Sequence, residues 1–132
     1  MEEQIVAVVK RPYQKPEITT IKKGLTPLQE LVGGTITAAD LPDMDEVYGY
    51  CNDEGLLIGL EPNFYRPEYK DAIVGTAVFV GGDNGRSVSL SSEQAKKIVG
   101  YLEKNSVNDL GEFVFNVKTN FAFYKPKSAS CM

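Results

Sequence analysis

Residues 72–80 read AIVGTAVFV, and this stretch decides the fold. Nearly all of its nine residues are apolar, and a short, continuous apolar run of this length is typical of a strand that is buried on both faces. We therefore predict that it forms the most buried strand of a sheet. Gly75 lies in its middle, which predicts a bulge or a close backbone approach at that point.

Other strands are predicted on both sides of a short helix. The β-branched run IVAVV at 5–9 and the run at 17–22 flank a loop that contains prolines, so they are expected to form a hairpin. Two further strands are predicted at 35–37 and 46–51. These strands and the buried run indicate a mixed or mostly antiparallel sheet.

The segment NDEG at 52–55 has the chemistry of a tight turn, because Asn and Asp bond to local backbone and Gly accepts positive φ. It lies between two strand-like runs, which predicts a hairpin. The proline-bracketed stretch EPNFYRPEY at 61–69 is predicted to be a loop. We also predict a loop for GGDNGR at 81–86, with its glycines as turn residues.

A short helix is predicted in GLTPLQELVGG, residues 24–34. Thr26 is a suitable N-cap, and Pro27 would stand at the first helical position, where its missing N–H has no partner to lose. Gly33 and Gly34 are expected to end this helix.

A longer helix is predicted from Ser91 onward. Ser91 and Gln94 have the spacing of a capping box, in which each side chain bonds to the other residue's backbone N–H. A stripe of apolar residues at helical spacing should pack on the sheet: Ala95, Ile98, Val99 and Leu102.

The predicted fold class is α+β, with one domain at residues 1–108. Residues 109–124 alternate aromatic or apolar with polar side chains, which predicts a strand extension that packs on the domain or on a partner subunit. Residues 125–132 are predicted to be a flexible tail.

Composition excludes several classes of chemistry. The 132 residues include no histidine, which removes histidine-dependent triads and general bases and nearly all zinc sites. The two cysteines, Cys51 and Cys131, are expected to be free thiols. No apolar run approaches the length of a membrane span, so a cytoplasmic protein is expected.

Neither an enzyme nor a cofactor is expected. Asp53 and Glu54 are adjacent acids in a turn, where both carboxylates are usually solvated and would point apart in a strand. A calcium loop counted from Asn52 places Leu56 at the fifth position, which needs an oxygen ligand. No metal site is therefore predicted.

The net charge of −4 is unevenly distributed. Residues 24–65 contain eight acids and no Lys or Arg, and a basic segment precedes them. This pattern fits a solvated acidic face, an acidic surface that docks on a basic partner, or a basic edge that receives an anion. Binding to duplex DNA is disfavoured. The candidate interaction surface comprises Asp43, Asp45, Glu46, Asp53 and Glu54.

Several short motifs in fixed order resemble one family over about residues 18–102. They are Leu28-Gln29, Val32-Gly33-Gly34-x-Ile36, Asn52-Asp53-Glu54-Gly55, Gly59-Leu60, Asn63, Asp71, Ile73, Gly75-Thr76, Val80-Gly81 and Ser89-Leu90. The chain resembles the domain-of-unknown-function family numbered 3846. That resemblance implies a setting in phages, conjugative elements or bacterial chromosomes. It implies no assigned activity and no catalytic residue.

Two functions are compatible with these observations. The first is a homo-oligomeric counter-defence protein that sequesters a nucleotide-type small molecule, by analogy with compact phage proteins of that kind. An amide, a ring and a guanidinium could bind base, sugar and phosphate. The candidate ligand residues are Asn63, Tyr65, Arg66, Tyr50, Lys70 and Arg86.

The alternative is an interaction module that inhibits a host defence enzyme by docking its acidic surface on a basic site. For Asn63 a third possibility is purely local, because its amide could cap the backbone of its own loop.

Overall fold

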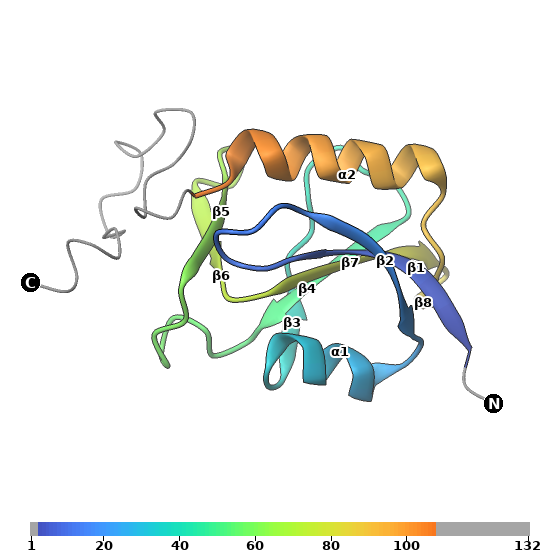
Figure 1. Ribbon diagram of the computed structural model, residues 1–132, viewed down its shortest axis with the longest axis horizontal. Coiled ribbons are helices and arrows are strands. Elements are labelled where there is room, and N and C mark those ends of the chain that lie inside the picture. Colours follow the sequence, from blue (N-terminus) through green and yellow to red (C-terminus); the bar gives the residue numbers. More distant parts are fainter. Residues whose placement is uncertain (1–2, 108–132) are drawn as a thin grey trace, which may run out of the picture.

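The computed structural model describes residues 3–107, shown as the coloured ribbon in Figure 1. The elements, in chain order, are β1 (Gln4–Lys10), β2 (Glu17–Lys22), α1 (Leu25–Val32), β3 (Ile36–Ala38), β4 (Val47–Asn52), β5 (Pro62–Arg66), β6 (Asp71–Val74), β7 (Ala77–Asp83), β8 (Arg86–Val88) and α2 (Ser92–Asn105).

The strands form a large and a small sheet. The large sheet has the order β2-β1-β7-β4-β3, and β8 pairs with the far end of β7. The small sheet is the hairpin of β5 and β6. Every pairing among the described strands is antiparallel, which confirms the predicted α+β class with its mostly antiparallel sheet.

The strand β7 is the centre of the molecule, because its two faces belong to two different cores. Val78 and Val80 pack with the residues of α1, whereas Ala77 and Phe79 pack with those of α2. All four side chains are fully buried. Figure 1 shows the same arrangement, with α2 above the sheet and α1 below it. The small sheet lies beside α2, and its residues share the α2 core.

The buried run at 72–80 is not one strand, as predicted, but two. Gly75 has φ +75°, a conformation that side chains with a Cβ rarely adopt, and it turns the chain out of β6. Before this corner the chain belongs to the small sheet, and after it to the large sheet. The glycine therefore marks a crossing between sheets and not a bulge within one strand.

The predicted hairpin at 52–55 is also wrong, although the turn is present. The Asn52 side chain accepts from the Glu54 N–H at 2.8 Å, as the turn chemistry requires. The residues after it do not form a strand; they continue as turns, with Leu60 N–H donating to the Gly55 carbonyl. Strand β4 pairs instead with β3 and β7.

Two segments predicted to be loops contain strands. The stretch 61–69 includes β5, which begins at Pro62, a position where a strand tolerates proline. In the stretch 81–86, Gly81 and Gly82 lie inside β7. Only Asn84 and Gly85, both with positive φ, make the turn to β8.

Helix α1 begins at Leu25, with Gly24 in the N-cap position, so the predicted cap at Thr26 is wrong. Pro27 falls inside the first turn, where the N–H groups lack partners in any helix. Gly33 ends the helix in the left-handed conformation, as predicted.

The predictions for the other elements near the two helices hold with small shifts. Helix α2 has the predicted capping box of Ser91 and Gln94. The strands expected at 35–37 and 46–51 lie one residue later, and Glu46 cannot belong to β4 because its φ is +57°. The predicted strand extension at 109–124 and the tail at 125–132 lie outside the described residues.

Gly49 of β4 is predicted to be essential for the packing of the sheet. A Cβ there would collide with the Ala39 carbonyl and lie 2.8 Å from the Phe79 ring. We expect Gly49→Ala to lower the free energy of unfolding by about 2 kcal/mol, the usual cost of overpacking. Urea denaturation measures the difference.

The matched control is Gly100→Ala in α2, where a Cβ would meet nothing within 4 Å. The same substitution there should raise the free energy of unfolding by about 0.5 to 1 kcal/mol, because alanine is the better helix former. Equal effects of the two substitutions would contradict the packing argument.

Candidate functional site

Asn63 lies in the interior and holds the two sheets together. Its side chain is fully buried, and its Nδ2 donates to the carbonyls of Lys10 and Gly75, each at 2.7 Å. Its Oδ1 accepts from Lys10 Nζ at 2.8 Å. These contacts connect β5 to the end of β1 and to the corner after β6. The amide predicted for a ligand is thus fully used by the protein.

Lys10 is the charged partner in this buried network. The residue has no exposed surface, and its Nζ donates to the Arg11 carbonyl and to Asn63 Oδ1. Burial disfavours the ammonium form and lowers the pKa of Lys10 to about 8, from the ordinary value of 10.5. The lysine stem and its head therefore belong to the fold and not to a surface.

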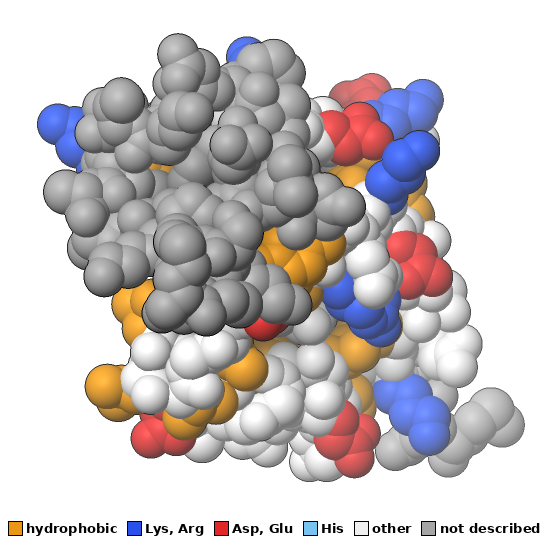
Figure 2. Space-filling view, turned by 60° about the vertical axis from the view of Figure 1, so that its left-hand side comes forward, with side chains coloured by type: hydrophobic (Ala, Val, Ile, Leu, Met, Phe, Trp, Pro, Cys, Tyr) orange, Lys and Arg blue, Asp and Glu red, His pale blue; other side chains and the backbone are white. Residues whose placement is uncertain are grey.

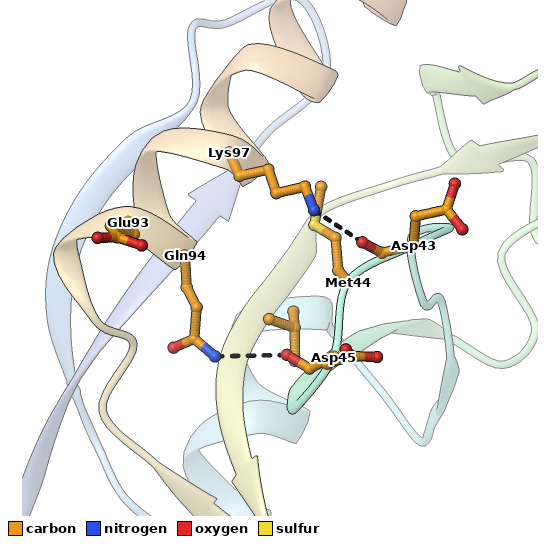
Figure 3. Close-up of a pocket in the computed structure, with 7 residues that line it drawn as sticks. Asp43, Met44, Asp45, Glu93, Gln94 and Lys97 are labelled. Atoms are coloured by element: carbon orange, nitrogen blue, oxygen red, sulfur yellow. Dashed lines mark hydrogen bonds between the residues drawn. The ribbon is translucent and has the colours of Figure 1, made fainter.

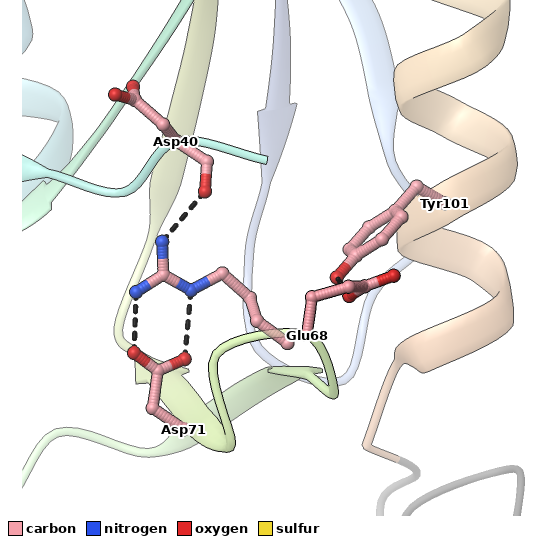
Figure 4. Close-up of polar contacts among 5 residues, drawn as sticks. Asp40, Glu68, Asp71 and Tyr101 are labelled. Carbon is pink, nitrogen blue, oxygen red and sulfur yellow. Dashed lines mark hydrogen bonds and ion pairs between the residues drawn. The ribbon is translucent and has the colours of Figure 1, made fainter. Parts of the chain in front are cut away.

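Arg66 is also held by the protein itself (Figure 4). Its guanidinium makes a two-pronged bond to the Asp71 carboxylate, and Nη1 donates to the Asp40 carbonyl at 2.7 Å. Burial opposes the charged form, but the bond to Asp71 outweighs it, and the pKa of Arg66 is raised. The guanidinium also lies over the Tyr69 ring, 4.7 Å from its centre.

The turn after β5 is tied to α2 by a second contact that Figure 4 shows. Tyr101 donates its hydroxyl proton to Glu68 at 2.7 Å. Burial, reinforced by the nearby carboxylate, raises the pKa of Tyr101. Tyr65 is itself almost fully buried. The polar residues around β5 are thus used to hold β5 and the turn after it against the rest of the fold.

The six predicted ligand residues do not meet in one place. Asn63, Tyr65 and Arg66 belong to β5 and its interior contacts. Lys70 is exposed in the turn between β5 and β6, where its φ is +53°. Tyr50 and Arg86, in contrast, line one hollow on the face of the large sheet that carries α1.

This hollow, here called the α1 hollow, has a volume of about 290 Å³. Its lining includes two cations, a tyrosine and a hydroxyl group: Lys23, Arg86, Tyr50 and Ser87. Gly24 and Leu25, at the start of α1, also line the hollow, and the N-cap residue Gly24 makes no side-chain cap. Pro27 has no N–H, so Leu25 and Thr26 supply the first two N–H groups of α1. These groups and the helix dipole favour an anion.

Among residues 3–107, the ion-pair partners of both cations of the α1 hollow lie on the surface. Lys23 lies 3.7 Å from Glu3, and Arg86 lies 3.5 Å from Asp83, with both acids well exposed. Surface pairs of this kind contribute little to stability, so an anionic ligand can compete for either cation.

Tyr50 stays uncharged at neutral pH. Burial raises its pKa, and the hydrogen bond with Ser87 opposes that shift without reversing it. The ring is half-buried, so one part remains available for contact. Its neighbour Tyr48 accepts from the Gly85 N–H at 2.9 Å and so fixes the turn that leads to Arg86.

Sequence reasoning did not include Lys23 and Ser87 in the ligand set. The available signal was the pair Lys22-Lys23 directly before the helix, which belongs to the basic segment noted above. Ser87 follows Arg86 in β8 and carried no separate signal.

The acidic surface divides into two parts. Asp43 and Asp45 line a second hollow of about 230 Å³ together with Glu93 of α2. We call these three acids the α2 acidic face. Figure 3 shows how α2 holds the acidic loop, because Lys97 donates to the Asp43 carbonyl and Gln94 to the Asp45 carbonyl. Within residues 3–107, the carboxylates of Asp43, Asp45 and Glu93 have no ion-pair partner.

The other predicted acids lie elsewhere. Glu46 precedes β4, and its carbonyl also accepts from Gln94, so it adjoins the α2 acidic face. Asp53 and Glu54 follow β4 at its opposite end. The five predicted residues therefore cannot form one continuous docking surface.

No metal centre emerges from the part of the chain that the structure describes, since it contains no group of three metal-binding side chains. Cys51 is buried and free, and burial raises its pKa, which makes it a poor nucleophile. Among residues 3–107, no helix has both the length and the apolar character needed to cross a membrane.

Residues 4–103 match the family model described as Domain of unknown function (DUF3846). Neither a curated protein nor a solved structure matches the chain.

The buried Lys10 is predicted to make stability depend on pH. Between pH 8 and 10.5 the unfolded chain keeps the Lys10 proton while the folded chain releases it, so the free energy of unfolding rises with pH. From pH 8 to 9.5 we expect wild type to gain roughly 1 to 2 kcal/mol relative to Lys10→Met.

Urea denaturation of both proteins at a series of pH values, under reducing conditions, measures this gain. The comparison cancels the titration of other groups, because they are shared by the two chains. Parallel curves for wild type and Lys10→Met would show that Lys10 does not change its pKa on folding.

Proposed function

The chain belongs to the DUF3846 family, which has no assigned activity, and we propose that it binds a nucleotide-type anion in the α1 hollow. The observation that carries this proposal is the meeting of Lys23, Arg86 and Tyr50 at the uncapped start of α1. Two cations at the start of a helix suit a phosphate, and a tyrosine ring suits a base.

The arrangement supports phosphate binding more than binding of a neutral molecule. Arg86 can offer two parallel N–H donors to phosphate oxygens, and Lys23 adds a point charge. Their acidic neighbours, Glu3 and Asp83, lie on the surface and can be displaced from the cations. Ser87 is a further potential hydrogen-bond partner.

The volume of the hollow supports a site that is completed by another subunit. About 290 Å³ lies just below the usual range for small-molecule sites, so a whole nucleotide would project from the hollow. A second copy facing the hollow would enclose the rest, which accords with the homo-oligomer proposed from the sequence. In a mobile-element setting, such an assembly would sequester a nucleotide signal made by host defence.

Native mass spectrometry of the full chain with AMP, ATP, NAD⁺ and cyclic di-AMP tests the proposal. We expect one of these probes to add a stoichiometric mass. Arg86→Ala and Lys23→Ala should each weaken its binding by about tenfold or more, because each removes a charge-assisted contact. Tyr50→Leu should weaken binding by a similar factor through lost stacking.

The matched control is Lys70→Ala, which removes an exposed cation that does not line the α1 hollow and should leave the affinity unchanged. Binding that survives Arg86→Ala and Lys23→Ala, or is lost in Lys70→Ala, would contradict the site. A chain that gains no mass with any of the four probes would count against nucleotide binding itself.

A second candidate function is supported by the α2 acidic face. The loop that carries Asp43 and Asp45 is bonded through its backbone to α2, which leaves the carboxylates directed outward. A fixed cluster of acids that has no ion-pair partner among residues 3–107 can dock on a basic site of a host enzyme and steer the encounter.

Charge reversal separates this candidate from nucleotide binding. We expect Asp45→Lys with Glu93→Lys to abolish salt-sensitive capture of a partner from bacterial lysate, compared at about 50 and 300 mM salt. These two positions avoid the positive-φ residues of the loop. Glu54→Lys, at the other end of β4, is the matched control and should capture as wild type does. The same captured proteins in all three chains would refute the docking surface.

A further inference from the structure

The turn after β4 exposes three consecutive large apolar side chains. Leu56, Leu57 and Ile58 are 70%, 87% and 58% exposed, and we call them the apolar tip. Single exposed apolar residues are ordinary, but a contiguous group marks a surface that something covers. Figure 2 looks onto this end of the molecule, where hydrophobic side chains gather on the surface beside acidic ones.

A groove of about 410 Å³ lies directly beside the apolar tip, and Leu56 and Leu57 form part of its wall. The rest of the wall is mostly apolar and comes from β3, the end of β4, and β6, including Ala38, Cys51, Ile73 and Val74. Asp53 lines the groove and Glu54 adjoins it. Arg66 also lines the groove, but its guanidinium is paired with Asp71. The groove is therefore mostly apolar, with Asp53 and Glu54 as an acidic margin.

Two strands with a free edge border this groove. Within the described residues, β3 pairs only with β4, and β6 pairs only with β5. An unpaired strand edge presents backbone donors and acceptors that an extended segment can bind, and side chains of that segment can fill an adjacent groove.

We propose that residues 113–124 of the same chain occupy this groove and cover the apolar tip. Their sequence, FVFNVKTNFAFY, supplies five aromatic residues to cover apolar surface. From Phe113 to the end of the chain there are three lysines and no acidic residue. Lys118 lies within the segment, and Lys125 and Lys127 follow it directly. An apolar segment with one positive charge, and two more just after it, complements an apolar groove with an acidic margin.

The point at which the described chain ends supports an occupant from the same molecule. The Val107 N–H donates to the Asn63 carbonyl at 3.0 Å, so residue 107 lies beside β5. Strand β6, which borders the groove, is the neighbour of β5 and about 5 Å away from it. Residues 108–112 can span up to about 17 Å, which is enough to cross β5 and β6.

Hydrogen–deuterium exchange of the full chain tests this inference. We expect the amides of residues 113–124 to exchange about tenfold or more slowly than in an unstructured peptide. Leu56→Ser with Leu57→Ser should return them to the unprotected rate. Both side chains are exposed, so the amides of α2 should stay protected and report an intact fold.

Ile18→Ser is the matched control, because Ile18 is 53% exposed on β2, at the opposite edge of the large sheet. It should leave the protection of 113–124 unchanged. Asp53→Lys with Glu54→Lys should reduce that protection through charge repulsion.

Three results would overturn the proposal. Unprotected amides at 113–124 in wild type would show that the segment does not dock. Protection that persists in Leu56→Ser with Leu57→Ser would place it elsewhere. Protection that increases with protein concentration, together with a dimer mass, would identify the segment of a second copy as the occupant.

Discussion

The structure depends on one buried amide, the side chain of Asn63. Its Nδ2 donates hydrogen bonds to the carbonyls of Lys10 and Gly75, and its Oδ1 accepts a hydrogen bond from the Lys10 ammonium. The first of these contacts joins the small sheet to β1, and the second holds the corner at which the chain leaves β6 for β7. Removing such an amide would take one acceptor from the buried Lys10 ammonium, which would keep its bond to the Arg11 carbonyl, and a donor from the carbonyls of Lys10 and Gly75. Leaving buried polar groups without these bonds is costly. The relative position of the two sheets is therefore fixed by polar contacts as well as by the shared apolar core.

This constraint decides which polar residues remain for a ligand. Because β5 is fixed against the α2 core, Tyr65 is buried in the protein interior. Arg66 donates its hydrogen bonds to the Asp71 carboxylate and the Asp40 carbonyl. The opposite face of the large sheet is different, since α1 is short and leaves part of that face uncovered. Tyr50 and Arg86 remain accessible there for this reason.

The sequence predicted best those features that depend on neighbouring residues. The capping box of α2 and the glycine that ends α1 both act within a few residues, and both are present. The sequence indicated an unusual backbone at Gly75. The corner at which the chain passes from the small to the large sheet, however, is held by Asn63, twelve residues away. Likewise Tyr50 and Arg86 could be named from their chemistry, whereas their meeting with Lys23 requires the order of the strands.

That order explains how the α1 hollow is assembled. Strand β7 is longer than its contact with β1, so β1 pairs with its first half and β8 with its last residues. The Leu90 N–H donates to the Val6 carbonyl, and this bond keeps the chain after β8 beside β1. Since β2 pairs along β1 and ends at Lys22, the next residue, Lys23, comes to the same wall as Arg86. An anion bound there would contact β8, the end of β2 and the start of α1 at once. The three segments meet only in the folded chain, so binding would stabilise the fold as well as select the ligand.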